Sequence, residues 1–130
     1  MATLDDVARL AERLPGVTEG RLYRNRSWVV AKKAFAWERP FSKADLERFG
    51  TETPPSGPIV AIRTADLNEK EAILAEHAQS CLTIAHFEGF AAVLVCLDAV
   101  DSDELRVLLE DGWLACAPPA LAQSYVDSRR

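Results

Sequence analysis

The chain has 130 residues, of which 48% are hydrophobic and 27% are charged, so its length and composition suit one globular domain and exclude a fibrous or disordered protein. No apolar run approaches the roughly 20 residues that span a membrane, and the first ten residues lack the apolar core of a signal peptide, so we expect a cytoplasmic protein with no membrane partner. The net charge of −5 argues at first against a nucleic-acid partner, and the three separated cysteines argue against a disulfide framework. We therefore expect a single domain over residues 1–130.

The first half of the chain is predicted to hold two helices separated by three strands. Thr3 has an acid three residues later, the arrangement of a capping box, and the apolar stripe that follows predicts a helix over 4–14. Ser42 has the same arrangement and begins a short predicted helix over 43–49. Alternating residue patterns predict a meander of three strands, over 21–24, 27–32 and 34–39.

The second half is predicted to hold three helices and three strands. N-caps at Asn68 and Asp101 begin two of the helices, and Pro118-Pro119 precedes the third. These helices are expected over 69–77, 102–116 and 120–126. The strands are expected over 58–63, 82–87 and 90–98, and the compact turn at Glu88-Gly89 joins the last two into a hairpin.

This order of elements predicts an α+β fold. We expect a two-layer sandwich in which a mostly antiparallel sheet of about five to six strands has helices packed on one face. Gly112 lies within the apolar stripe of the fourth helix, where glycine is unfavourable, which indicates that another element approaches that helix closely.

Residues 21–48 form the basic part of an acidic protein. They hold eight basic and three acidic side chains, a local net charge of +5, while the rest of the chain carries −10. Such asymmetry gives one face a positive potential, which is a precondition for an anionic partner. Aromatic residues are interleaved with these charges at Trp28, Phe35, Trp37 and Phe41.

Alternation along the strands predicts which of these side chains share a face. Trp28 and Lys32 fall on one side of their strand, and Phe35, Trp37 and Arg39 align in the next strand. If this face is exposed, it places stacking planes beside phosphate-binding charges; if it is buried, the aromatic residues fill the core and the charges are solvated. The candidate nucleic-acid-binding residues are Arg24, Arg26, Lys32, Lys33, Trp37, Arg39 and Lys43.

The sequence carries no recognised catalytic or cofactor motif. It has no glycine-rich phosphate loop and no G-x-S-x-G elbow. Cys81 and His86, five residues apart on a predicted strand, point to opposite faces and do not form a nucleophile–base pair. The acids around Asp101 are explained by helix capping and by the helix dipole. We expect no catalytic residue, no metal and no cofactor.

Seven segments serve as landmarks along the chain. They are LPGVTEG (14–20), YRNRSW (23–28), KAFAWERP (33–40), KADLE (43–47), IRTADLNEKEAIL (62–74), HFEGFAAVLVCLD (86–98) and ELRVLLEDGWLACAP (104–118). In order and spacing they resemble the MmcQ/YjbR-like family over nearly the whole chain. The resemblance implies a frataxin/CyaY-like sandwich and a DNA-binding label, and it brings no catalytic residues. Many members have glycine where this chain has Lys32, so we expect a longer or looser hairpin turn there.

Three hypotheses follow for the function. The first is a non-enzymatic module that binds DNA mainly through its backbone, using the basic and aromatic hairpin. The second is a module that binds a small ligand or anion in a pocket bounded by Trp37, Arg39 and His86. The third is a module that binds a protein through its acidic helical face. Composition and motifs leave the oligomeric state open.

Overall fold

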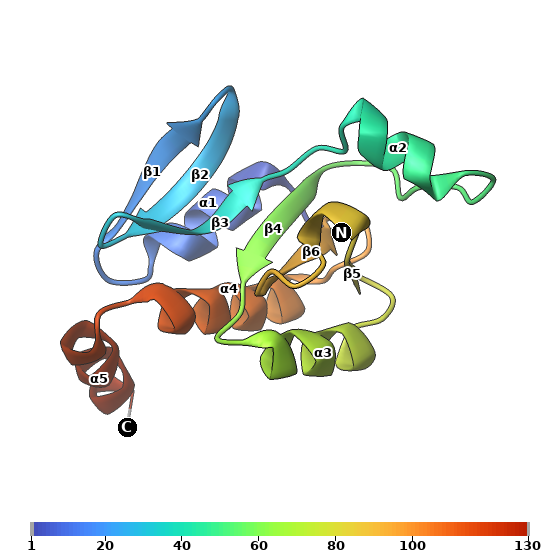
Figure 1. The fold of residues 1–130 in the computed structure, drawn as a ribbon. Helices are drawn as coiled ribbons and strands as arrows, with labels where there is room; N and C mark the ends of the chain where they lie inside the picture. The colour runs from blue at the N-terminus through green and yellow to red at the C-terminus, as the bar shows by residue number, and fades with distance from the viewer. Residues whose placement is uncertain (1, 130) are drawn as a thin grey trace.

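The structure is a computed structural model and describes residues 2–129. Its helices are α1 (Leu4–Glu12), α2 (Lys43–Phe49), α3 (Leu67–Glu76), α4 (Ser102–Cys116) and α5 (Pro119–Ser128), with a 3₁₀ turn, η1 (Ala85–Phe87). Its strands are β1 (Val17–Leu22), β2 (Asn25–Val30), β3 (Lys33–Glu38), β4 (Ile59–Arg63), β5 (Cys81–Leu82) and β6 (Ala92–Cys96). Figure 1 shows their arrangement.

The strands form one sheet in the order β1-β2-β3-β4-β6-β5, and every neighbouring pair is antiparallel. The main core lies between one face of this sheet and the helical layer, to which α1, α3 and α4 contribute buried side chains such as Val7, Ile73 and Leu108. The predicted α+β sandwich is thereby confirmed. We call this side of the sheet the covered face.

The opposite side of the sheet, which we call the second face, is only partly covered. A smaller apolar cluster over β4 and β6 packs beneath Phe87 of η1, with Phe41 and Trp37 at its margin. Over β1 the same face carries Thr18 and Leu22, whose side chains are exposed. The second face therefore has a covered half under η1 and an open half over β1 and β2.

Helix α4 crosses the sheet closely at Gly112, as the sequence predicts. A Cβ atom added there would lie 2.6 Å from Ile62 Cγ2 and 3.3 Å from the carbonyl oxygen of Phe35. The missing side chain therefore lets α4 pack directly on β3 and β4.

Several predicted element boundaries are wrong. The first strand begins at Val17, and the predicted strand residues Tyr23 and Arg24 form the turn to β2. The third helix begins two residues earlier than expected, because the side chain of Asp66, not that of Asn68, accepts the first-turn N–H. The first and last helices also differ by two residues at their ends, which is ordinary fraying.

The predicted strand over 82–87 is also wrong. Only Cys81–Leu82 pairs with β6, and the chain then turns through η1 so that Phe87 is buried on the second face. Lys70, which is 5% exposed, holds this turn from α3 by donating to the carbonyl oxygens of Phe87 and Phe90 at 2.7 and 2.8 Å. A contact from a distant element thus holds the turn that follows the strand. Within residues 2–129, no helix is both long and apolar enough to cross a bilayer.

Candidate nucleic-acid interface

A β-bulge in β3 decides which aromatic side chains reach the surface. Trp28 pairs with Ala36 and Val29 with Ala34, so Phe35 is an extra residue opposite β2. Because of this extra residue, Phe35 lies on the covered face beside Trp28, whereas Trp37 lies on the second face. The predicted alignment of Phe35 with Trp37 is therefore wrong. Trp28 and Phe35 belong to the core, and Trp37 is half-buried at its margin on the other side.

Arg26 is placed on the covered face, away from Trp37. Its guanidinium makes two hydrogen bonds to Glu19, at 2.8 and 2.9 Å, and a third to Asp5 at 3.0 Å. The bonds from Arg26 lower the pKa of the Glu19 carboxyl, and those from Glu19 and Asp5 raise the pKa of Arg26. This residue clamps β1, β2 and α1 together and is not presented to a ligand on the second face.

Arg39 lies on the second face and ties the end of β3 to α2. Its Nη1 donates to Asp45 at 3.0 Å and to the carbonyl oxygen of Pro40, and its guanidinium lies 5.6 Å from the ring centre of Phe87. Burial by itself would raise the pKa of Asp45, but hydrogen bonds from Ser42 and Arg39 outweigh it and lower that pKa. Among the described residues, Nε and Nη2 of Arg39 are left without a protein hydrogen bond.

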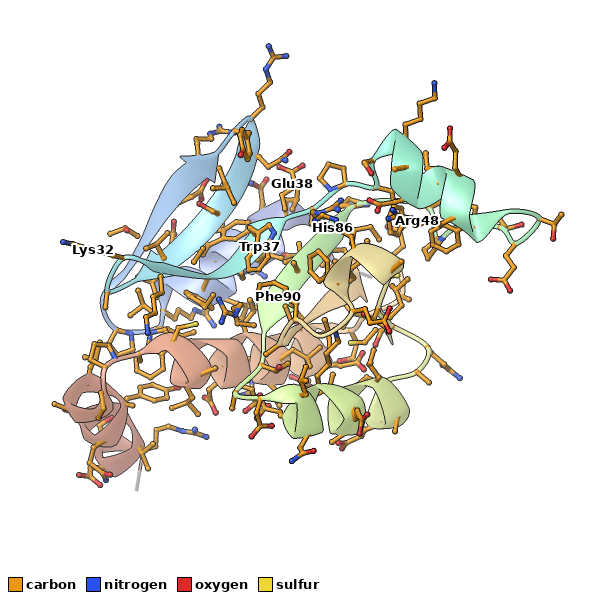
Figure 2. The ribbon with its side chains drawn as sticks, in the orientation of Figure 1. Lys32, Trp37, Glu38, Arg48, His86 and Phe90 are labelled. Atoms are coloured by element: carbon orange, nitrogen blue, oxygen red, sulfur yellow. The ribbon has the colours of Figure 1, made fainter. Side chains whose placement is uncertain are left out.

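A groove of about 300 Å³ lies between the β1–β2 turn and the segment that leads to α2. We call it the Tyr23–Trp37 groove. It is lined by Leu22, Tyr23, Asn25, Trp37, Glu38, Arg39 and Pro40. The ring of Trp37 is supported from below by Phe87 and Phe90, at centroid distances of 6.4 and 6.3 Å. Figure 2 shows Trp37 and Glu38 in the centre of the molecule, between the hairpin and α2.

The remaining basic candidates lie at two separate places. Arg24 is in the β1–β2 turn next to Tyr23, and Lys43 is the first residue of α2, three residues after Pro40; neither lines the Tyr23–Trp37 groove. Lys32 and Lys33 lie at the β2–β3 turn, at the other end of β2, which spans about 20 Å. In Figure 2 the side chain of Lys32 extends from the far left of the sheet, well away from Trp37.

The turn that carries Lys32 is tight. Val30 pairs with Lys33, which leaves only Ala31 and Lys32 in the turn, with φ angles of 48° and 70°. These are the positive values of a type I′ turn, where glycine and asparagine are preferred. The expected longer or looser turn is therefore wrong: the strand pairing on either side holds two strained residues in a two-residue turn.

The three residues of the predicted small-ligand pocket surround the ring of Phe87 and do not enclose an open cavity. His86 is in η1 and not on a strand, and its ring lies 6.1 Å from that of Phe87. Trp37 and Arg39 also lie against the Phe87 ring, which is buried. Trp37 and Arg39 do line a common groove, but His86 is not among the residues that line it.

The acidic face of the third hypothesis lies in the helical layer. A groove of about 990 Å³ runs beside α3 and α4 and is lined by Glu76, His77, Asp101, Asp103, Glu104 and Asp111, among others. Burial and the neighbouring acids raise the pKa of Asp111. Within the groove, Glu104 accepts hydrogen bonds from His77 and Ser80. Nearby Cys81 is inert because burial raises the pKa of its thiol to about 12.

Tyr23 is the residue that sequence reasoning missed. It is 95% exposed, it has a φ of 61°, and it lines the groove opposite Trp37. The available signal was the spacing between two strand-like runs, VTEGRL and NRSWVV, which are separated by only two residues. Assigning Tyr23 to a strand hid that signal.

Comparison with known proteins identifies relatives of the whole chain. The uncharacterized proteins Rv2570 of Mycobacterium tuberculosis and Mb2600 of Mycobacterium bovis are each 41% identical over 129 residues, which cover 97% of this chain and 97% of each relative. No family model matches the sequence. The crystal structure of Deinococcus radiodurans protein DR2400, described as a DUF419 domain, is similar with a TM-score of 0.60 over 88% of this chain and 78% of that one. At 21% identity this likeness supports the α+β fold alone.

Proposed function

Because this chain belongs to the family of the mycobacterial protein Rv2570, whose name records no activity, we propose a function from the surface of the domain itself: it binds DNA on the open half of the second face. We also propose that this family is MmcQ/YjbR-like, on the strength of the seven sequence landmarks. The DNA-binding label of that group agrees with the proposal.

One observation carries the proposal. The open half of the second face has basic side chains at both of its ends and a half-buried indole, Trp37, beside it. Arg24 lies at one end of β2, and Lys32 lies in the turn at the other. Lys33 pairs with Val30 of the main core, so its side chain lies on the covered side of the sheet. Cations separated in this way can contact phosphates along a strand of nucleic acid, while an aromatic ring between them can contact a base.

Sequence-specific reading of a duplex is not part of the proposal. A major-groove reader presents several base-contacting side chains from one helix. Helix α2, which begins at Lys43, is seven residues long and has the sequence KADLERF. Binding should therefore depend mainly on phosphate contacts and should weaken steeply as salt is added.

The test is a fluorescence-anisotropy titration of labelled single-stranded and duplex DNA at low and at physiological salt. The informative variant is Arg24→Glu with Lys32→Glu, which reverses one exposed charge at each end of β2. Arg39 is left unchanged because its loss would leave the buried Asp45 without its ion pair. We expect the variant to bind more weakly and its log–log salt dependence to be shallower by about two phosphate contacts, or roughly 1.4–1.8 in slope.

The matched control is Arg13→Glu with Arg106→Glu, which makes the same charge change at two exposed residues that line one groove on α1 and α4. The control should bind DNA nearly as the unchanged protein does. An equal loss in both double variants would show that only net charge matters. Absence of binding at tens of micromolar protein in low salt would refute the proposed function.

A further inference from the structure

We propose that the Tyr23–Trp37 groove is a slot for one unpaired nucleobase, so that the protein prefers single-stranded DNA to duplex. This inference rests on the proposed function and specifies which part of the DNA the groove recognises. It assigns a binding role to Tyr23 and Asn25, neither of which the basic pattern of the sequence singles out.

The size and walls of the groove suit a base. Its volume of about 300 Å³ is at the lower end of the range for small-molecule sites, which is sufficient for one nucleotide but not for a base pair with its backbones. Two of its lining residues, Tyr23 and Trp37, offer aromatic rings. Rings of this kind bind any base by stacking, since every base has a π face.

The conformation of Tyr23 supports a role in binding. The residue has a φ of 61°, which is unfavourable for a bulky side chain, and its ring is 95% exposed, so burial in the domain does not compensate. The two-residue turn between Leu22 and Asn25 accounts for this φ, and it leaves the side chain accessible to a ligand. In Figure 1 the β1–β2 turn that carries Tyr23 rises at the top of the molecule, on the same side as α2.

Polar groups complete the slot. The side-chain amide of Asn25 supplies a donor and an acceptor, which match the paired groups along a base edge. Arg39 uses Nη1 for its protein hydrogen bonds, and among the described residues its Nε and Nη2 remain for a phosphate. Arg24 follows Tyr23 directly and adds a second cation.

This arrangement favours unpaired bases for a simple reason. In a duplex each base is already stacked on its neighbours and its pairing edge is occupied, so neither Tyr23 nor Asn25 can reach it without unstacking. A single strand offers both its faces and its edges.

The test compares three DNA ligands of about 12 nucleotides, a length within the site sizes of known single-strand binders. They are a thymidine strand, a strand of equal length made only of abasic deoxyribose phosphate, and a duplex. We expect the thymidine strand to bind about ten-fold or more tightly than the abasic strand. Tyr23→Ala should remove this difference and leave the salt dependence unchanged, whereas Tyr23→Phe should retain it.

Two further variants keep the test decisive. Tyr23→Gly also removes the ring but relieves the backbone at positive φ, so it keeps the turn. Leu46→Ala, at an exposed position on α2, is the control and should bind as the unchanged protein does. Equal affinity for the thymidine and abasic strands, or tighter binding to the duplex, would overturn the slot but leave backbone-driven binding in place. No binding to any of the three ligands would refute the proposed function itself.

Discussion

Basic residues that look equivalent in the sequence have different roles in the structure. Arg26 and Arg39 both lie in the basic segment, yet Arg26 clamps Glu19 and Asp5 on the covered face and Arg39 holds Asp45 on the second face. Each guanidinium forms more than one hydrogen bond, for which its planar fork is suited. Their charges are therefore part of the fold, whereas those of Lys32 and Lys33 stand on an exposed turn.

Asp45 makes a testable contribution to stability at this scale. Its carboxylate is 3% exposed, caps α2 through Ser42 and pairs with Arg39. Because hydrogen bonds lower its pKa in the folded state below the ordinary value of 3.8, its charged form stabilises the fold above that value, and this stabilisation is lost as the pH falls through the lower folded-state pKa.

We therefore expect Asp45→Asn to lower the free energy of unfolding at pH 7, and we expect this deficit to shrink as the pH falls below 3.8. Urea unfolding at pH 7, 5 and 3 measures the difference between the two proteins. A difference that does not change with pH would contradict the assigned role of the charge. Glu52→Gln, at an exposed position in the loop after α2, is the matched control, because it removes a carboxylate that is not buried.

In the β2–β3 turn, strand pairing overrides the preference of non-glycine residues for negative φ. Ala31 and Lys32 both adopt positive φ, each at a cost of about 1–2 kcal/mol, because the pairing of Val30 with Lys33 allows only two residues between the strands. The bulge at Phe35 follows immediately and rotates β3 so that Trp37 reaches the second face. Together, the turn and the bulge position the Trp37 indole on the second face.

Replacing Ala31 and Lys32 by asparagine and glycine should stabilise the protein. Both residues suit positive φ, so we expect the free energy of unfolding to rise by about 1–2 kcal/mol. Lys33→Gly, one position later in β3, is the control and should lower it by about 0.5–1 kcal/mol. Denaturant unfolding measures both. A decrease in the first variant would show that the turn does not have the conformation described.

Across the whole molecule, charge and packing are divided between the two sides of the sheet. Basic turns border the open half of the second face, while a groove in the helical layer is lined by acids. Packing follows the same division: α4 buries six residues in the main core, whereas α2 buries only Asp45. Figure 1 shows α2 standing at the periphery, joined to the sheet by extended segments.

This uneven packing predicts uneven local stability. The backbone amides of α2 should exchange with solvent much faster than those of α4, because α2 can open without exposing the main core. Hydrogen exchange followed by mass spectrometry would measure both helices in one experiment. Binding of single-stranded DNA beside Arg39 should slow exchange in α2 and leave α4 unchanged. Equal protection of α2 and α4 in the free protein would contradict this prediction.

Local patterns in the sequence were sufficient to predict the layers of the fold. The capping signals at Thr3, Ser42 and Asp101 and the apolar stripes of the helices act through neighbours in the chain, so their consequences could be predicted without coordinates. The glycine at 112 indicated a close approach to its helix, but not which strands make it. The local excess of positive charge over residues 21–48 is likewise a property of the sequence.

Tertiary structure alone decided the composition of the candidate site. The bulge at Phe35 depends on strand pairing, the turn after β5 is held by Lys70 of α3, and the exposure of Tyr23 depends on where β2 begins. Each of these is set by contacts between residues far apart in the chain, whose free energies outweigh local preferences. A basic and aromatic hairpin follows from residues 21–48 alone, whereas long-range strand pairing selects which of its side chains meet water.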